Sequence, residues 1–108
     1  ARVLLLGVAY KRDLEDWRES PALEVLRLLE ADGVAVRYHD PYVPEVQVAG
    51  RTYRSVPLTQ EAVAGADLVI ITTDHSTIDY RWVVEQARAV LDTRYATRGI
   101  ESEKIVLL

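Results

Sequence analysis

The chain of 108 residues contains no cysteine, and this absence removes whole classes of chemistry. Without thiols there are no disulfide bonds, no thiolate metal ligands and no cysteine nucleophile. No apolar run approaches the roughly 18 residues of a membrane-spanning helix, and no signal peptide is recognisable, which predicts a cytoplasmic protein without membrane contact. An initiating methionine is also missing, and the first residues already resemble a strand. We therefore expect the chain to be a piece of a longer polypeptide.

Positive charge is in short supply. The chain has 13 Lys and Arg against 17 Asp and Glu, a formal net charge of -4. General nucleic-acid-binding proteins carry a basic face, so nucleic acid is not an expected partner, although a local basic cluster still suits a small phosphate ligand. The composition is otherwise ordinary for a globular protein, and the length predicts one domain.

Strand and helix patterns alternate along the chain. Apolar or alternating runs predict strands at residues 2–9, 34–38, 66–73, 89–92 and 105–108. Helices are predicted at residues 21–32, from Thr59 to about 64, and at 80–87, while residues 41–58 form either a short hairpin or a third strand. This order predicts an α/β fold: a three-layer α/β/α Rossmann-like domain with a mostly parallel sheet of about five strands.

Loops that follow the strands hold the candidate binding residues. In an open parallel sheet, ligands bind beyond the C-terminal ends of the strands. Lys11, Arg18 and Arg94 all fall in such loops, with Tyr10 beside the lysine. Lysine and arginine both suit phosphate, arginine as a bidentate fork. The alternatives are a solvated surface lysine and a surface pair between Arg94 and Asp92.

Gly7 lies where a dinucleotide fold would begin its glycine-rich turn. The further glycines of that signature are replaced by Ala9 and Arg12. A bulky arginine does not allow the close backbone approach that a pyrophosphate needs, so we do not expect this chain to bind NAD by itself in the standard way. Asp40 ends the second strand, where an acid can bind a ribose hydroxyl.

Neither histidine has a sequence context that indicates catalysis. No nucleophile adjoins His39 or His75, so structural or exposed roles are favoured. Asp74, His75 and Asp79 match no known spacing of metal ligands, and no metal site is predicted.

Five stretches together resemble one enzyme family. They are Gly7-Val-Ala-Tyr-Lys11, Asp16-x-Arg18-Glu-Ser-Pro-Ala-Leu-Glu24, Tyr38-His-Asp-Pro-Tyr42, Thr73-Asp-His-Ser76 and Asp92-Thr-Arg94. Over essentially its whole length, the chain resembles the C-terminal, UDP-binding domain of the UDP-glucose/GDP-mannose dehydrogenase family. The third and fourth stretches look most like the branch acting on UDP-N-acetylglucosamine or UDP-N-acetylmannosamine.

The resemblance implies roles for individual residues. It implies that Tyr10, Lys11 and Arg94 contact the UDP-sugar, and that Arg18 reaches an NAD bound by another Rossmann domain. Family enzymes oxidise the C6 alcohol of a nucleotide sugar to a carboxylate in two NAD-linked steps, through a cysteine in a central region, and are commonly dimers or larger. UDP-sugar, NAD and further copies of the chain are therefore the implied partners.

The chain departs from the complete family pattern, because it has neither the glycine-rich NAD domain nor the cysteine. Residues 1–108 are thus expected to be the UDP-sugar-binding C-terminal domain of an NAD-dependent UDP-sugar 6-dehydrogenase, inactive alone and with no catalytic residue of its own. The alternative is a non-catalytic nucleotide-binding or dimerisation module, since one fold serves many functions.

Overall fold

The computed structural model describes residues 1–9 and 20–108. Five strands form one sheet in the order β2-β1-β5-β6-β7, and every neighbouring pair is parallel. The strands are β1 (Arg2–Leu6), β2 (Ala35–His39), β5 (Leu68–Ile71), β6 (Val90–Asp92) and β7 (Ile105–Leu107). The predicted parallel sheet is therefore confirmed.

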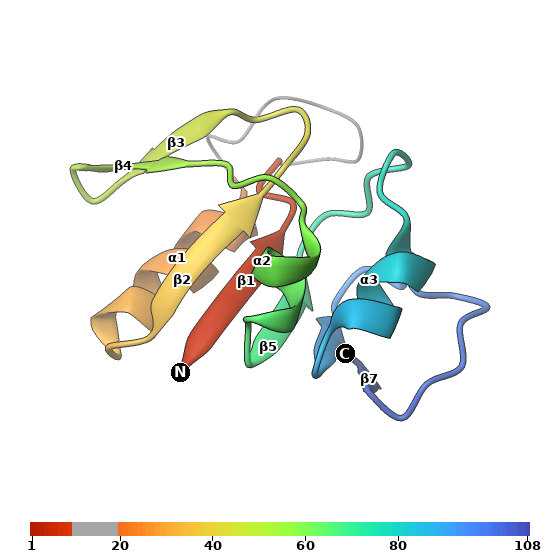
Figure 1. Ribbon diagram of the computed structural model, residues 1–108. Coiled ribbons are helices and arrows are strands. Elements are labelled where there is room, and N and C mark those ends of the chain that lie inside the picture. The colour runs from red at the N-terminus through yellow and green to blue at the C-terminus, as the bar shows by residue number, and fades with distance from the viewer. Residues whose placement is uncertain (10–19) are drawn as a thin grey trace.

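Helices cover both faces of this sheet, which makes the domain three-layered (Figure 1). The helix α1 (Pro21–Ala31) lies behind the sheet, and α2 (Gln60–Ala64) and α3 (Tyr80–Gln86) lie in front of it. Alternate residues of β1 serve the two faces: Val3 and Leu5 join the core with α1, whereas Leu4 joins the core with α2 and α3. A strand buried on both sides explains the unbroken apolar run in the sequence.

Polar side chains fix the starts of the three helices in the described ranges, and two of these caps were expected from the sequence. The hydroxyl oxygen of Ser20 accepts from the amide of Ala22 at 3.2 Å, and that of Thr59 accepts from Ala62 at 3.2 Å. The third cap is Asp79, whose carboxylate accepts from the amide of Trp82 at 3.1 Å. Each cap satisfies an amide that has no partner inside its own helix.

Residues 41–58, which the sequence left open, contain a hairpin. Antiparallel strands β3 (Glu45–Val48) and β4 (Arg51–Arg54) pair with each other and lie across the end of β2 in Figure 1. Between them Ala49 and Gly50 both have positive φ, 51° and 79°. Two such residues form the tight turn whose twist matches a hairpin. The buried Val46 anchors the hairpin to the core beside α1.

The order in which the chain passes through the sheet indicates where a binding site is expected. From β1 the chain crosses to β2 on one side and later returns to β5 on the other, so the strand order reverses between β1 and β5. Open α/β sheets bind ligands at that reversal, outside the C-terminal strand ends. No helix in the described ranges is long and apolar enough to cross a membrane.

Candidate functional site

The C-terminal edge of the sheet gathers the loops that the sequence singled out. Loops after β1, β2, β5 and β6 all leave at this edge because the strands are parallel. Arg94 lies in the loop after β6. Tyr10, Lys11 and Arg18 lie outside the described residues, so their proposed roles stay predictions.

Gly7 directly follows β1 and brings two loops into contact. Its φ of 90° is one that residues with a side chain rarely adopt, and a Cβ there would lie 2.4 Å from the Cβ of Thr73. Across this contact, the hydroxyl of Thr72 donates to the carbonyl of Gly7, and the hydroxyl of Thr73 donates to that of Ala9 at 2.9 Å. The loops after β1 and β5 are therefore joined directly.

The two residues that flank segment 10–19 are hydrogen-bonded to each other. The hydroxyl of Ser20 donates to the carbonyl of Ala9 at 3.4 Å, and both residues are buried. Ser20 also caps α1. The segment thus departs from and rejoins the described structure at one place on the C-terminal edge.

Asp40 is turned inward and does not meet solvent. One carboxylate oxygen accepts from the amides of Val8 at 2.8 Å and Ala9 at 3.1 Å, and the other accepts from Tyr42 at 2.8 Å. Burial raises the pKa of Asp40, but the hydrogen bonds from His75, Tyr42 and Val8 outweigh it and leave the pKa below its ordinary value. The interpretation of Asp40 as a ribose-binding acid is wrong, because its acceptor positions are taken by the protein.

His75 completes this cluster. The ring is fully buried, and its Nε2 lies 2.9 Å from the same oxygen of Asp40 that holds the two amides. A carboxylate accepts only, so Nε2 carries the hydrogen. The ring of Tyr42 packs against the imidazole, with centroids 4.9 Å apart. His39 is also structural, since its Nδ1 donates to the carbonyl of Val56 at 2.8 Å.

The three residues considered for a metal are occupied elsewhere. Asp74 pairs with Arg98 at 3.0 Å, Asp79 caps α3, and His75 binds Asp40. In the described part of the chain, no three potential ligand side chains come together.

The described part of the turn after β1, residues 7–9, does not offer its amides to the pyrophosphate of NAD. In a dinucleotide fold, amides of this turn face the phosphates. Here the amides of Val8 and Ala9 donate to Asp40, and that of Gly7 donates to the carbonyl of His39 at 2.9 Å. The place of the phosphate is thus filled by a carboxylate of the chain itself.

Hydrogen bonds fix the backbone of Arg94 and leave the end of its side chain available to a ligand. The carboxylate of Asp92 accepts from the amides of Arg94 at 3.0 Å, Ala96 at 3.1 Å and Thr97 at 2.8 Å, so Asp92 is a buried loop cap and not a surface partner of the guanidinium. The Nε of Arg94 donates to the carbonyl of Thr72 at 3.1 Å. No carboxylate among the described residues pairs with the two terminal nitrogens, which leaves a fork that suits phosphate.

A mostly apolar hollow of about 270 Å³ opens beside Arg94. It is lined by the first turns of α1, by β5 and β6, and by Leu108, with Ala22, Val25, Ile70 and Leu91 among its walls. Pockets that enclose a drug-sized ligand measure about 300–1,000 Å³, so this hollow is too small to enclose such a ligand completely. A larger hollow of about 460 Å³ surrounds the N-terminal half of β1, away from this edge.

Comparison with protein families gives a match over most of the chain. Residues 4–99 match the model described as the UDP-glucose/GDP-mannose dehydrogenase family, UDP binding domain. A UDP-N-acetyl-D-mannosamine dehydrogenase from Pyrococcus horikoshii is 37% identical over 75 residues, which is 69% of this chain and 16% of that protein. A UDP-glucose 6-dehydrogenase from Pseudomonas aeruginosa is 38% identical over 80 residues, 67% of this chain and 17% of that protein.

Solved structures agree with the sequence comparison. The UDP-D-ManNAc dehydrogenase of Pyrococcus horikoshii superposes with a TM-score of 0.73 at 27% identity, covering 99% of this chain and 24% of that one. An NDP-N-acetyl-D-galactosaminuronic acid dehydrogenase from Methanosarcina mazei gives 0.74 at 25% identity, covering 100% and 24%. The match to the curated relatives covers about a sixth of their length, and the match to the solved structures covers 24% of those chains.

Proposed function

Since the chain belongs to the UDP-glucose/GDP-mannose dehydrogenase family, as its UDP binding domain, we propose that it grips the diphosphate end of a UDP-sugar for an NAD-dependent 6-dehydrogenase. The enzyme oxidises the C6 alcohol of a UDP-hexose or UDP-N-acetylhexosamine to the uronic acid. Residues 1–108 form its C-terminal domain, and further polypeptide supplies the NAD domain and the reactive cysteine. Binding energy from the nucleotide end then positions C6 for oxidation.

The observation that carries the proposal is the position of Arg94. Its fork, which has no carboxylate partner among the described residues, stands at the same sheet edge as Ala9 and Ser20, the two residues that flank the segment containing Tyr10 and Lys11. Helix α1 begins directly after Ser20, and its first turn lines the hollow next to Arg94. Two cations from separate loops at one edge suit the two phosphates of UDP.

We do not expect this domain to hold NAD by itself. The filled turn after β1 makes independent NAD binding by this domain unfavourable. We assign Arg18 to a contact with NAD held mainly by another domain. In the whole enzyme, Arg18→Ala should then raise the NAD requirement more than the UDP-sugar requirement.

Titration of the 108-residue chain tests the proposal directly. We expect UDP to bind weakly, by calorimetry or by chemical-shift changes in a ¹⁵N spectrum, and NAD not to bind. Arg94→Ala should weaken UDP binding by about ten- to a hundredfold, because a charge-assisted contact to phosphate contributes roughly 1.5–3 kcal/mol. Lys11→Ala should act similarly.

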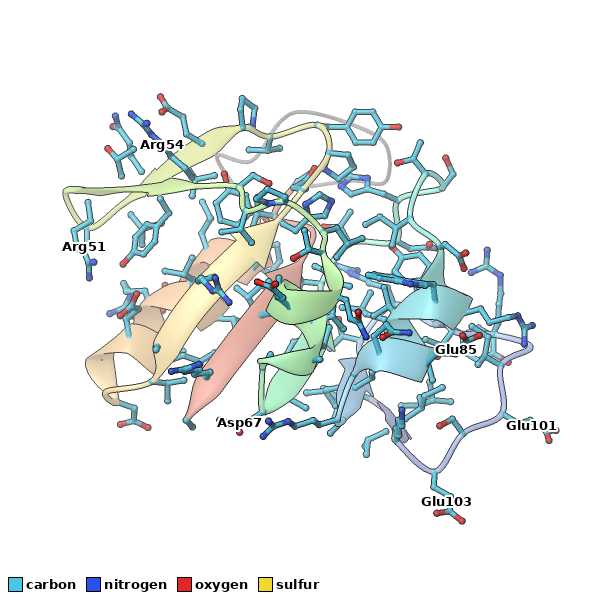
Figure 2. The ribbon with its side chains drawn as sticks, in the orientation of Figure 1. Arg51, Arg54, Asp67, Glu85, Glu101 and Glu103 are labelled. Carbon is cyan, nitrogen blue, oxygen red and sulfur yellow. The ribbon has the colours of Figure 1, made fainter. Side chains whose placement is uncertain are left out.

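Arg88→Ala is the matched control for Arg94→Ala. Arg88 is also an exposed arginine, but it pairs with Asp67, which Figure 2 shows near the opposite end of the sheet. UDP affinity should be unchanged in this variant. Equal losses in Arg88→Ala and Arg94→Ala would contradict the assigned site. Reading the coding sequence upstream separates the enzyme from a non-catalytic module, because the enzyme requires a glycine-rich strand–turn–helix and a cysteine-bearing region there.

A further inference from the structure

We propose that Asp40 is a positioning residue for UDP recognition: its carboxylate, held by His75, fixes the backbone of Val8 and Ala9 at the point where segment 10–19 begins. The inference rests on the proposed function, because it assigns to that segment the UDP contacts of Tyr10 and Lys11. Asp40 itself touches no ligand, since its acceptor positions are filled from within the protein.

The two consecutive amides set the path of the chain. Val8 and Ala9 both point their N–H groups at one oxygen of Asp40, at 2.8 and 3.1 Å. On the other side, the hydroxyls of Thr72 and Thr73 hold the carbonyls of Gly7 and Ala9. The backbone of Val8 and Ala9 is thus held from both sides, up to the last described residue before the segment.

Asp40 is itself buried and fixed by several contacts. It is 3% exposed, and the second carboxylate oxygen caps the amide of Tyr42 in the same loop. His75 reaches the first oxygen from the loop after β5, and the ring of Tyr42 packs on the imidazole. One side chain therefore joins the loops after β1, β2 and β5. Breaking it frees the entrance of the segment without removing any group that meets UDP.

A binding segment with a fixed entrance loses less freedom when the ligand arrives, and affinity rises accordingly. Asp40→Asn tests this, because an amide is similar in size but offers one acceptor atom where the carboxylate offers two. It cannot satisfy all four donors at once. We expect UDP to bind about tenfold more weakly to this variant.

The experiment is a UDP titration of the ¹⁵N-labelled chain, with hydrogen exchange followed on the same samples. In Asp40→Asn, the amides of Val8 and Ala9 should exchange faster, while the amides in the middle of β1 keep their protection. Asp67→Asn is the matched substitution at the other end of the sheet, where the carboxylate accepts from the amide of Arg2 at 2.8 Å, and it should bind UDP normally. Val83→Ala lowers stability from the opposite core and should also bind UDP normally, which separates positioning from general destabilisation.

A second pair of variants tests the same link from the other side. His75→Phe keeps a ring but removes the donor to Asp40, and should weaken UDP binding about tenfold. His75→Gln keeps an N–H near the Nε2 position and should restore affinity to within about twofold of wild type.

The outcomes distinguish the two proposals. Absence of UDP binding to the wild-type chain overturns the proposed function. If the wild-type chain binds UDP but a folded Asp40→Asn binds it within twofold of wild type, the positioning role is overturned and the proposed function stands. Should Asp40→Asn fail to fold, His75→Phe decides: affinity within twofold of wild type overturns the role, and a loss that His75→Gln repairs supports it.

Discussion

Replacing Gly7 by alanine should destabilise the domain by far more than one methyl group ordinarily would. The added Cβ would lie 2.4 Å from the Cβ of Thr73 and 2.8 Å from its backbone nitrogen, both closer than real Cβ atoms come. Neither atom is the end of a flexible side chain, so the two loops must move apart. Shortening Thr73 to alanine would not relieve the contact, because the Cβ and the nitrogen remain.

Two costs combine in this substitution. A side chain at a positive φ costs about 1–2 kcal/mol, and forcing extra volume into a packed place costs about 1–3 kcal/mol. The loss of glycine's freedom in the unfolded chain returns roughly 0.4–1 kcal/mol. We therefore expect Gly7→Ala to lower the free energy of unfolding by about 2–4 kcal/mol, a large share of the 5–15 kcal/mol typical of a domain.

Gly33→Ala provides the matched comparison in urea unfolding. Gly33 has a similar φ of 81°, but a Cβ there meets nothing within 4 Å, so only the backbone cost applies. This variant should lose about 1 kcal/mol. The difference between the two variants measures the contact between the loops after β1 and β5. If Gly7→Ala costs no more than Gly33→Ala, the reasoning about that contact is wrong.

Two further predictions concern charge. Burial raises the pKa of Asp92, but hydrogen bonds from Thr97 and from backbone amides outweigh it and leave the pKa lowered. The stabilisation is therefore complete above the unfolded-state value of about 3.9 and is lost as the pH falls through the lower folded value. Between pH 5 and 2 the unfolding free energy should drop less steeply in Asp92→Asn than in wild type; parallel curves would contradict this. Arg27→Ala breaks the exposed pair with Glu24 on α1 and should change the unfolding free energy by less than about 0.5 kcal/mol, since 49% and 59% of the two side chains are exposed. A loss above about 1 kcal/mol would show that this pair is worth more than its exposure indicates.

Local signals predicted most of the fold. Ser20 followed by Pro21 marked the start of α1, and Thr59 marked that of α2, because capping depends on residues close in sequence. Strand positions followed from unbroken apolar runs, and the family resemblance is confirmed by the match over residues 4–99. The first strand was predicted too long, since it ends at Leu6, before the positive φ of Gly7.

Features that depend on distant contacts were harder to predict. The hairpin turn at Ala49 and Gly50 lacks the Asn-Gly or Asp-Gly pair that usually signals it, so residues 41–58 stayed ambiguous. The pairing of Asp40 with His75 spans 35 positions in sequence and exists only because β2 and β5 flank β1. Both residues lie in motifs of the family resemblance, which was the one signal for them, but spacing alone gave no reason to bring them together.

The bond between Ser20 and Ala9 has a consequence for how such domains diversify. Because Ala9 and Ser20 bond to each other, the ten residues between them can be exchanged without altering the sheet. The entropic cost of closing a loop rises only slowly with loop length, so insertions between these two residues cost little stability. A different segment can then be accommodated between β1 and α1 on the same sheet.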